Sequence, residues 1–139
     1  MNVLQSKIWK FSLITLLLPA AVLAQAPAKK PAAKSSGQVI YEQHCLTCHQ
    51  VNGSGVPNLN PPLRNTDWVN GDKNRLINVV LKGLQGQEIE GDMYDNAMPA
   101  HDFLTDPQIA DVLTYIRSSF GNKAGAVTAE EVKATRSQK

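Results

Sequence analysis

The pentapeptide Cys45-Leu46-Thr47-Cys48-His49 constrains this chain more than any other stretch of its sequence. It contains both cysteines of the 139 residues, and a histidine directly follows the second one. This C-x-x-C-H pattern is typical of covalent haem attachment. Two thiols at this spacing can add to the two vinyl groups of one porphyrin, and the next residue can place an imidazole nitrogen on the iron. We therefore predict one covalent haem c, attached through Cys45 and Cys48, with His49 as an iron ligand.

Two other interpretations of the cysteine pair are weaker. A thioredoxin-like redox pair, or a disulfide in that setting, belongs in a βαβ pattern, whereas this chain offers loops and helices around the motif. A structural zinc site needs four ligands, and two cysteines with scattered histidines are a poor set. The pattern therefore favours haem over both.

Residues 1–24 have the composition of a secretory signal peptide. The first ten residues carry two lysines and no acid, and residues 11–24 are apolar apart from Ser12 and Thr15. Compact residues precede a cut after Ala24; a cut after Ala26 also fits, but Pro27 would follow it. The apolar run is shorter than the ~20 residues of a spanning helix. We therefore predict cleavage, no stable membrane insertion and a periplasmic protein.

The rest of the chain divides into a linker, one domain and a tail. Residues 25–36 contain only Ala, Pro, Lys, Gln and Ser, which predicts a flexible, solvated tether. We predict a domain over residues 37–121 and a C-terminal tail with a short helix over residues 122–139.

From Gly37 onward nine Lys/Arg face twelve Asp/Glu, so this part is acidic. Its basic residues are not clustered, which argues against a nucleic-acid partner.

Hydrophobic periodicity and capping residues predict an all-α fold. The expected helices cover residues 36–48, 73–81, 105–120 and 128–136. Ser35 or Ser36 can cap the first helix, on which Tyr41, Cys45 and Cys48 share one face and should point at the same object. His44 is expected on the surface.

The later helices carry clear start and stop signals. Asp67 or Asp72 can cap the second helix, and Gly83 is expected to end it. Capping boxes begin the third helix at residues 105–108 and the fourth at residues 128–131. Gly121 is expected to end the third helix, and Ile89, in the loop between the second and third helices, should turn inward.

The loops between these helices hold the other candidate haem contacts. Residues 51–63 are rich in Gly and Pro, and a carbonyl near Pro61 and Pro62 can accept the second N–H of His49. Met98 is the favoured sixth ligand of iron, because Pro99 keeps it out of the α region and presents its thioether from an extended loop. On the residues alone, Met93 and His101 remain alternatives.

Six stretches together resemble a class I monohaem cytochrome c. They are Tyr41-x-x-x-Cys45-x-x-Cys48-His49, Gly53-x-Gly55-Val56-Pro57, Pro61-Pro62-Leu63, Val80-Leu81-x-Gly83-Leu84-x-Gly86, Tyr94-x-x-x-Met98-Pro99 and Leu113-x-Tyr115-Ile116-Arg117. The likeness is greatest to small bacterial periplasmic domains attached to, or serving, quinoprotein and alcohol dehydrogenases and oxidases. It implies three to four helices wrapped around one haem, thioethers from Cys45 and Cys48, His49 as proximal ligand and Met98 as distal ligand. Gln50 stands where many relatives have glycine.

These features predict an electron carrier and not an enzyme. An apolar cavity is expected between His49 and Met98, and the side chains expected to line it are Pro62, Leu63, Leu76, Val80, Tyr94 and Leu113. Two filled axial positions favour electron transfer between a dehydrogenase or bc-type donor and a terminal acceptor, by a monomeric carrier. The alternatives are a dissociable haem subunit of a dehydrogenase or oxidase complex and, less favoured, a haem enzyme or gas sensor.

Overall fold

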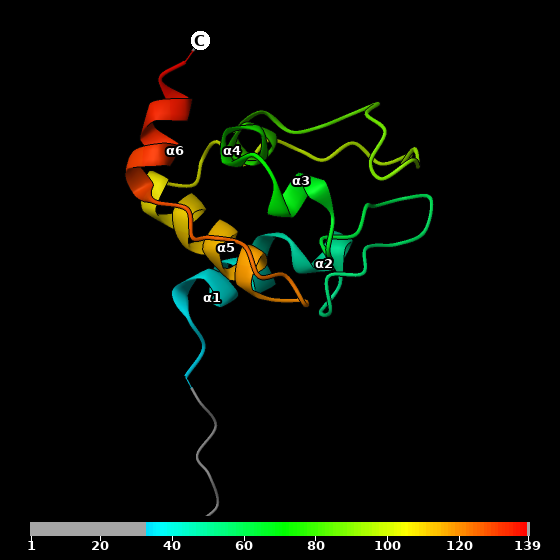
Figure 1. Ribbon diagram of the computed structural model, residues 1–139, viewed down its shortest axis with the longest axis horizontal. Helices are drawn as coiled ribbons and strands as arrows, with labels where there is room; N and C mark the ends of the chain where they lie inside the picture. The colour runs from blue at the N-terminus through cyan, green and yellow to red at the C-terminus, as the bar shows by residue number, and fades with distance from the viewer. Residues whose placement is uncertain (1–32, 139) are drawn as a thin grey trace, which may run out of the picture. The chain divides into compact units, whose positions relative to one another are not determined.

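The computed structural model describes residues 33–138. The predicted signal peptide and nearly all of the predicted linker lie outside the described residues. The described part contains six helices: α1 (Ser36–His44), α2 (Leu46–His49), α3 (Asp67–Asn70), α4 (Lys73–Lys82), α5 (Asp106–Ser118) and α6 (Ala129–Arg136). Among them, none combines the length and apolar character needed to cross a membrane. The all-α prediction is confirmed (Figure 1).

The first predicted helix is broken at Cys45. The Ser35 hydroxyl accepts the N–H of Gln38 at 3.2 Å and caps α1 as expected. At Cys45 the backbone has φ −117° and ψ −31°, so α1 ends and the single turn of α2 begins. The prediction of a continuous helix through Cys48 was therefore wrong.

Tyr41, near the end of α1, is buried in an aromatic cluster. Its ring is 1% exposed and lies 5.6 Å from that of Tyr115 and 5.2 Å from that of Phe120, centroid to centroid. Its hydroxyl donates to the carbonyl of Gln50 at 2.6 Å, and burial raises its pKa well above the usual value. Tyr41 thus belongs to an aromatic cluster and lies close enough to Cys45 for that thiol to contribute to its raised pKa.

A short helix precedes the second predicted helix. Thr66 accepts the N–H of Val69 at 3.2 Å and begins α3, which periodicity did not predict because it is a single turn. Asp72 accepts the N–H of Arg75 at 2.7 Å and begins α4. Gly83, with φ 77°, ends α4 as predicted.

Helix α5 begins at its predicted capping box and ends earlier than expected. The N–H of Thr105 donates to the side chain of Gln108 at 2.9 Å. The helix stops at Ser118, because Phe120 adopts a left-handed conformation with φ 57° and starts a turn that Gly121 continues. The prediction that the helix reaches Phe120 was therefore two residues too long.

Helix α5 is the centre of the helical core. It contacts both α1 and α6, and α4 packs on both α5 and α6. Side chains under 10% exposed fill the space between these helices: Ile40, Ile77, Ile109, Val112, Leu113, Ile116 and Val132. Figure 1 shows two long loops extending from the helices on the same side, before α3 and after α4.

Helix α6, predicted in the tail, packs into this core. Val132 is fully buried, and the Thr135 hydroxyl donates to the side chain of Asn74 at 3.0 Å. The Arg136 guanidinium donates to Asp106 at 2.7 Å and to the carbonyl of Leu104 at 2.7 Å. These contacts stabilise a helix that would be marginal alone.

The crossing of α1 and α5 leaves no room for a side chain at Gly37. A Cβ there would lie 2.1 Å from the carbonyl oxygen of Asp111 and 2.9 Å from the Cβ of Tyr115. Gly37→Ala should therefore separate the helices and lower the free energy of unfolding by about 1–3 kcal/mol, as measured by urea denaturation. The control is Gly125→Ala, since no atom lies within 4 Å of a Cβ there. Equal losses in both variants would contradict the packing argument.

The ion pair between α4 and α6 should make stability depend on pH. Lys73 donates to Glu131 at 2.8 Å and holds the pKa of that carboxyl below its usual 4.5. Because the pKa of Glu131 is lower in the folded protein than in the unfolded chain, the ion pair stabilises the fold at pH values above 4.5. This stabilisation is lost as the pH falls through the pKa of the folded protein. Glu131→Gln keeps an acceptor for the capping box but removes the charge.

We expect Glu131→Gln to cost about 0.5–1 kcal/mol at neutral pH and little once the carboxyl of the parent is protonated. Thermal unfolding of both proteins across the acid range measures this difference. Glu130→Gln is the matched control, because it removes a charge from the same first turn without touching Lys73. A difference that stays constant from neutral to acid pH would be incompatible with the ion-pair explanation.

Candidate haem-binding site

His49 is held by a hydrogen bond at one nitrogen of its ring. It is the last residue of α2 and is 8% exposed. Its Nδ1 lies 3.0 Å from the carbonyl oxygen of Pro61, which can only accept, so Nδ1 carries the hydrogen. The free nitrogen is therefore Nε2, in the neutral ring form that binds metals. Burial favours the same form, because it lowers the pKa of His49.

The two thiols lie beside this ring. The N–H groups of Cys48 and His49 donate to the carbonyl of Cys45 at 3.2 and 2.9 Å, which closes the turn that carries all three side chains. Cys45 is half-buried and Cys48 is exposed. Burial, helped by the neighbouring Cys48, raises the pKa of the Cys45 thiol to about 11. Both cysteines line a pocket that His49 also lines.

Met98 is anchored to the end of α4. The N–H of Leu84 donates to the carbonyl of Met98 at 3.0 Å, and the N–H of Met98 donates back at 2.8 Å. At Gly83, where φ is 77°, a Cβ would lie 2.5 Å from the Met98 carbonyl oxygen. The N–H of His101 donates to Val80 at 2.8 Å. The backbone on both sides of Met98 is therefore held in place.

One cavity, divided into three adjoining pockets, lies between His49 and Met98. Both residues line each pocket. The empty volumes, which include space open to solvent, are about 580, 440 and 520 Å³. The structure places all six predicted lining residues in these walls: Pro62, Leu63, Leu76, Val80, Tyr94 and Leu113.

Several lining residues were not predicted. They are Trp68, Val79, Leu84, Leu104, Val112 and Ile116. The predicted helical stripes already contained Leu84, Val112 and Ile116, which could have identified these three, whereas Val79 and Leu104 lie outside those stripes. Trp68 sits on α3, which was not predicted, and its ring lies 4.7 Å from the guanidinium carbon of Arg75. Ile89 is 5% exposed and turns inward as expected.

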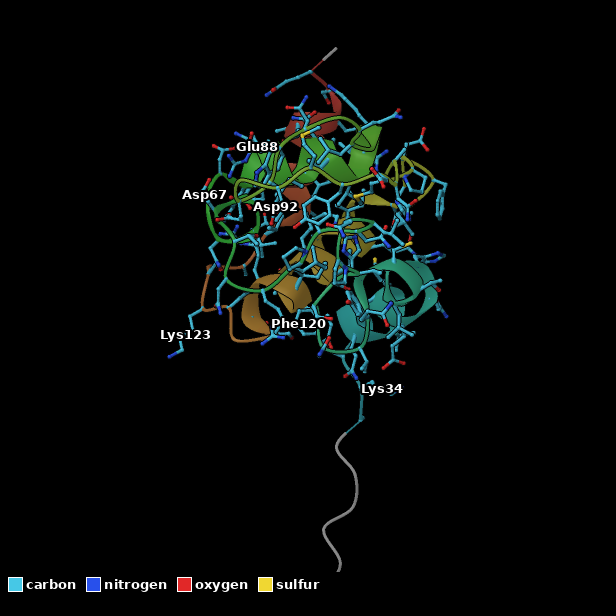
Figure 2. All side chains as sticks on the ribbon, turned by 90° about the vertical axis from the view of Figure 1, so that its right-hand side faces the viewer. Lys34, Asp67, Glu88, Asp92, Phe120 and Lys123 are labelled. Carbon is cyan, nitrogen blue, oxygen red and sulfur yellow. The ribbon has the colours of Figure 1, made fainter. Side chains whose placement is uncertain are left out.

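The alternative axial ligands are placed differently from Met98. Met93 is 58% exposed and is not among the lining residues of these pockets. His101 lines two of them, and its Nδ1–H donates to the carbonyl of Pro99 at 3.0 Å, which leaves Nε2 as the free ring nitrogen, as in His49. His44 is exposed at the rim, where its ring lies 5.4 Å from that of Phe103. The two long loops seen in Figure 1 face the viewer in Figure 2, where Glu88 and Asp92 of the loop after α4 are labelled.

The donor set fits an iron porphyrin. Two thiols, one imidazole nitrogen and one thioether sulfur surround an apolar cavity, and soft sulfur with imidazole is a haem-iron ligand pair. Within residues 33–138 no three His, Cys, Asp or Glu side chains gather as a protein-only metal site would require. The described site is therefore that of a helical haem protein.

Comparison with known proteins agrees with this class. The cytochrome c family matches residues 35–120. Cytochrome c-552 of Thermus thermophilus is 39% identical over 117 residues, which cover 77% of this chain and 78% of that protein. The gluconate 2-dehydrogenase cytochrome c subunit of Pantoea cypripedii is 36% identical over 73% of this chain. The cytochrome c subunit of the quinone alcohol dehydrogenase of Gluconacetobacter polyoxogenes is 38% identical over 72%.

The chain belongs to the cytochrome c family. It is a monohaem class I cytochrome c with covalently attached haem c, and it serves in haem-based electron transfer rather than catalysis. The chain spans 24% and 22% of the length of the two dehydrogenase subunits, and the similarity to them therefore concerns one part of each.

Proposed function

We propose that Cys45 and Cys48 hold the haem through thioethers and that His49 Nε2 and Met98 Sδ occupy the two axial positions of its iron. The observation that supports this most is that His49 and Met98 both line every pocket of one apolar cavity. When bound, the haem supplies the redox chemistry, in which iron alternates between Fe(II) and Fe(III).

The side chains of this chain set the conditions for that chemistry. The Pro61 carbonyl orients His49 and raises its basicity by accepting the Nδ1 hydrogen. The soft thioether of Met98 favours Fe(II) and raises the reduction potential relative to a second imidazole. The apolar walls act in the same direction, because burial disfavours the extra charge of Fe(III). With His49 and Met98 both bound to its iron, the haem would offer no open position to oxygen or a substrate.

We further propose a monomeric periplasmic carrier that takes electrons from a dehydrogenase or bc-type donor and passes them to a terminal acceptor. The basic and apolar first 24 residues support export. The relatives named as cytochrome subunits of gluconate, alcohol and fructose dehydrogenases support a dehydrogenase as partner. The same names favour the second candidate, a dissociable haem subunit of such a complex.

Met98→Ala tests the axial assignment. The parent protein should give a pyridine haemochrome spectrum of haem c, and its reduced form should bind carbon monoxide slowly at neutral pH. The variant should bind carbon monoxide rapidly, because its iron loses a ligand. Its reduction potential should fall by on the order of 0.1 V, within the ~0.8 V that axial ligands span.

Met93→Ala is the matched control, since it removes an exposed methionine five residues away. It should leave both the spectrum and the carbon monoxide rate unchanged. An unaltered spectrum in Met98→Ala, with a changed one in Met93→Ala or His101→Ala, would transfer the ligand role to that residue. Rapid carbon monoxide binding by the parent protein would favour a haem enzyme or sensor.

The oligomeric state separates a carrier from a subunit. Purified from its own cells, a free carrier should elute from size exclusion at the mass of one chain. A dissociable subunit should instead elute at low ionic strength together with a larger dehydrogenase or oxidase. Recovery of the haem only in such a large fraction would replace the carrier proposal with the subunit proposal.

A further inference from the structure

The turn that orients His49 is closed by its own hydrogen bonds. The N–H of Val56 donates to the carbonyl of Asn60 at 2.9 Å, and the N–H of Asn60 donates back at 2.8 Å. Asn58, between them, has a left-handed backbone with φ 61°. The next residue, Pro61, presents the carbonyl that accepts the Nδ1 hydrogen of His49. The turn over residues 56–61 is therefore a defined unit attached to the proximal side of the cavity.

The loop that carries Met98 is bonded to this same turn. The N–H of Asp95 donates to the carbonyl of Asn58 at 2.9 Å, and the N–H of Asn96 donates to the carbonyl of Leu59 at 3.1 Å. The Asn96 side-chain amide donates to the side-chain oxygen of Asn60 at 3.2 Å. We call these three hydrogen bonds the loop clasp. The loops that it joins extend on the side of the molecule that faces the viewer in Figure 2.

The loop clasp lies two residues before Met98. Only Ala97 separates Asn96 from Met98, and the pair of hydrogen bonds to Leu84 holds Met98 itself. Asn60, Asn96 and Met98 line the same pocket. The thioether-bearing residue is thus held by α4 on one side and by the proximal turn on the other.

Other contacts of this loop lie further away. Residues 90–93 are exposed, and the turn between Ile89 and Asp92 is bonded within itself. Glu90 accepts the N–H of Asp67 at 2.7 Å, and Ile89 is buried against the other end of the cavity. These contacts hold the start of the loop, whereas the loop clasp holds the part next to Met98.

We propose that the loop clasp is a positioning device that keeps Met98 on the iron, and that it links the position of Met98 to the turn that orients His49. The inference rests on the proposed role of Met98 as the distal ligand. Asn58, Asn60 and Asn96 act in it as positioning residues, because they reach the iron only through the two ligands. Opening of the clasp would let Met98 move away while the α4 core stays folded.

The first test is a double-mutant cycle on the side-chain bond. Asn60→Ala and Asn96→Ala should each speed carbon monoxide binding to the reduced holoprotein about tenfold, which corresponds to ~1.4 kcal/mol in the opening equilibrium. The double variant should be no faster than either single one, because both remove the same bond. The reduction potential should fall in all three.

The second test acts on the backbone of the turn. Asn58→Val places a β-branched residue at a left-handed position and should distort the turn, whereas Asn58→Gly should be tolerated. We expect faster carbon monoxide binding and a lower potential for the valine variant alone. The pair separates the effect of the turn's conformation from the loss of the asparagine side chain.

Two controls separate positioning from a general loss of stability. Asn52→Ala removes a local hydrogen bond to the N–H of Ser54 in the same loop, outside the clasp. Ile109→Val weakens the core of α5, where the side chain is fully buried. At temperatures well below unfolding, neither should alter the carbon monoxide rate or the potential.

The outcomes distinguish this inference from the proposed function. If the parent is closed to carbon monoxide and Met98→Ala opens it, but the clasp variants behave like the parent, the positioning role is overturned and the ligand assignment stands. Equal effects in the clasp variants and in Ile109→Val would also overturn it, since they would report stability alone. Rapid binding by the parent itself would overturn the ligand assignment and the inference with it.

Discussion

The close crossing of α1 and α5 at Gly37 is the contact on which the rest of the structure depends. It places the end of α1 against the aromatic cluster, and Cys45 and His49 follow at the break between α1 and α2. Leu113 and Ile116 of α5 form the wall that they face. A haem site thus arises where a helix pair meets a loop-covered apolar surface.

Local signals in the sequence predicted most of the helical framework. Ser35, the two capping boxes and Gly83 act within four residues of the positions they specify, so their effects can be read without the fold. The same holds for the lining residues on α4 and α5, because a helical stripe that packs on haem is also a core stripe. Local rules therefore identified both the framework and the apolar walls of the candidate site.

Long-range contacts account for what sequence reasoning missed. The position of Tyr41 depends on Tyr115 and Phe120, which lie more than seventy residues further along the chain. The turn at Phe120 and the packing of α6 likewise depend on tertiary neighbours. The carbonyl that orients His49 was expected near Pro61 or Pro62, but only the folded loop shows that it is Pro61.

The hydrogen bonds that hold His49 and Met98 also suit an electron carrier. A carrier must keep the same ligands in two oxidation states, so each ligand needs support that does not depend on the iron's charge. The two proposed ligands have such support, His49 from Pro61 and Met98 from Leu84, in both cases through backbone groups that cannot change protonation. Because these supports lie in loops outside the helical core, a ligand could be loosened without unfolding the protein. The loop clasp joins the turn that holds His49 to the loop that carries Met98, at the place where such loosening would begin.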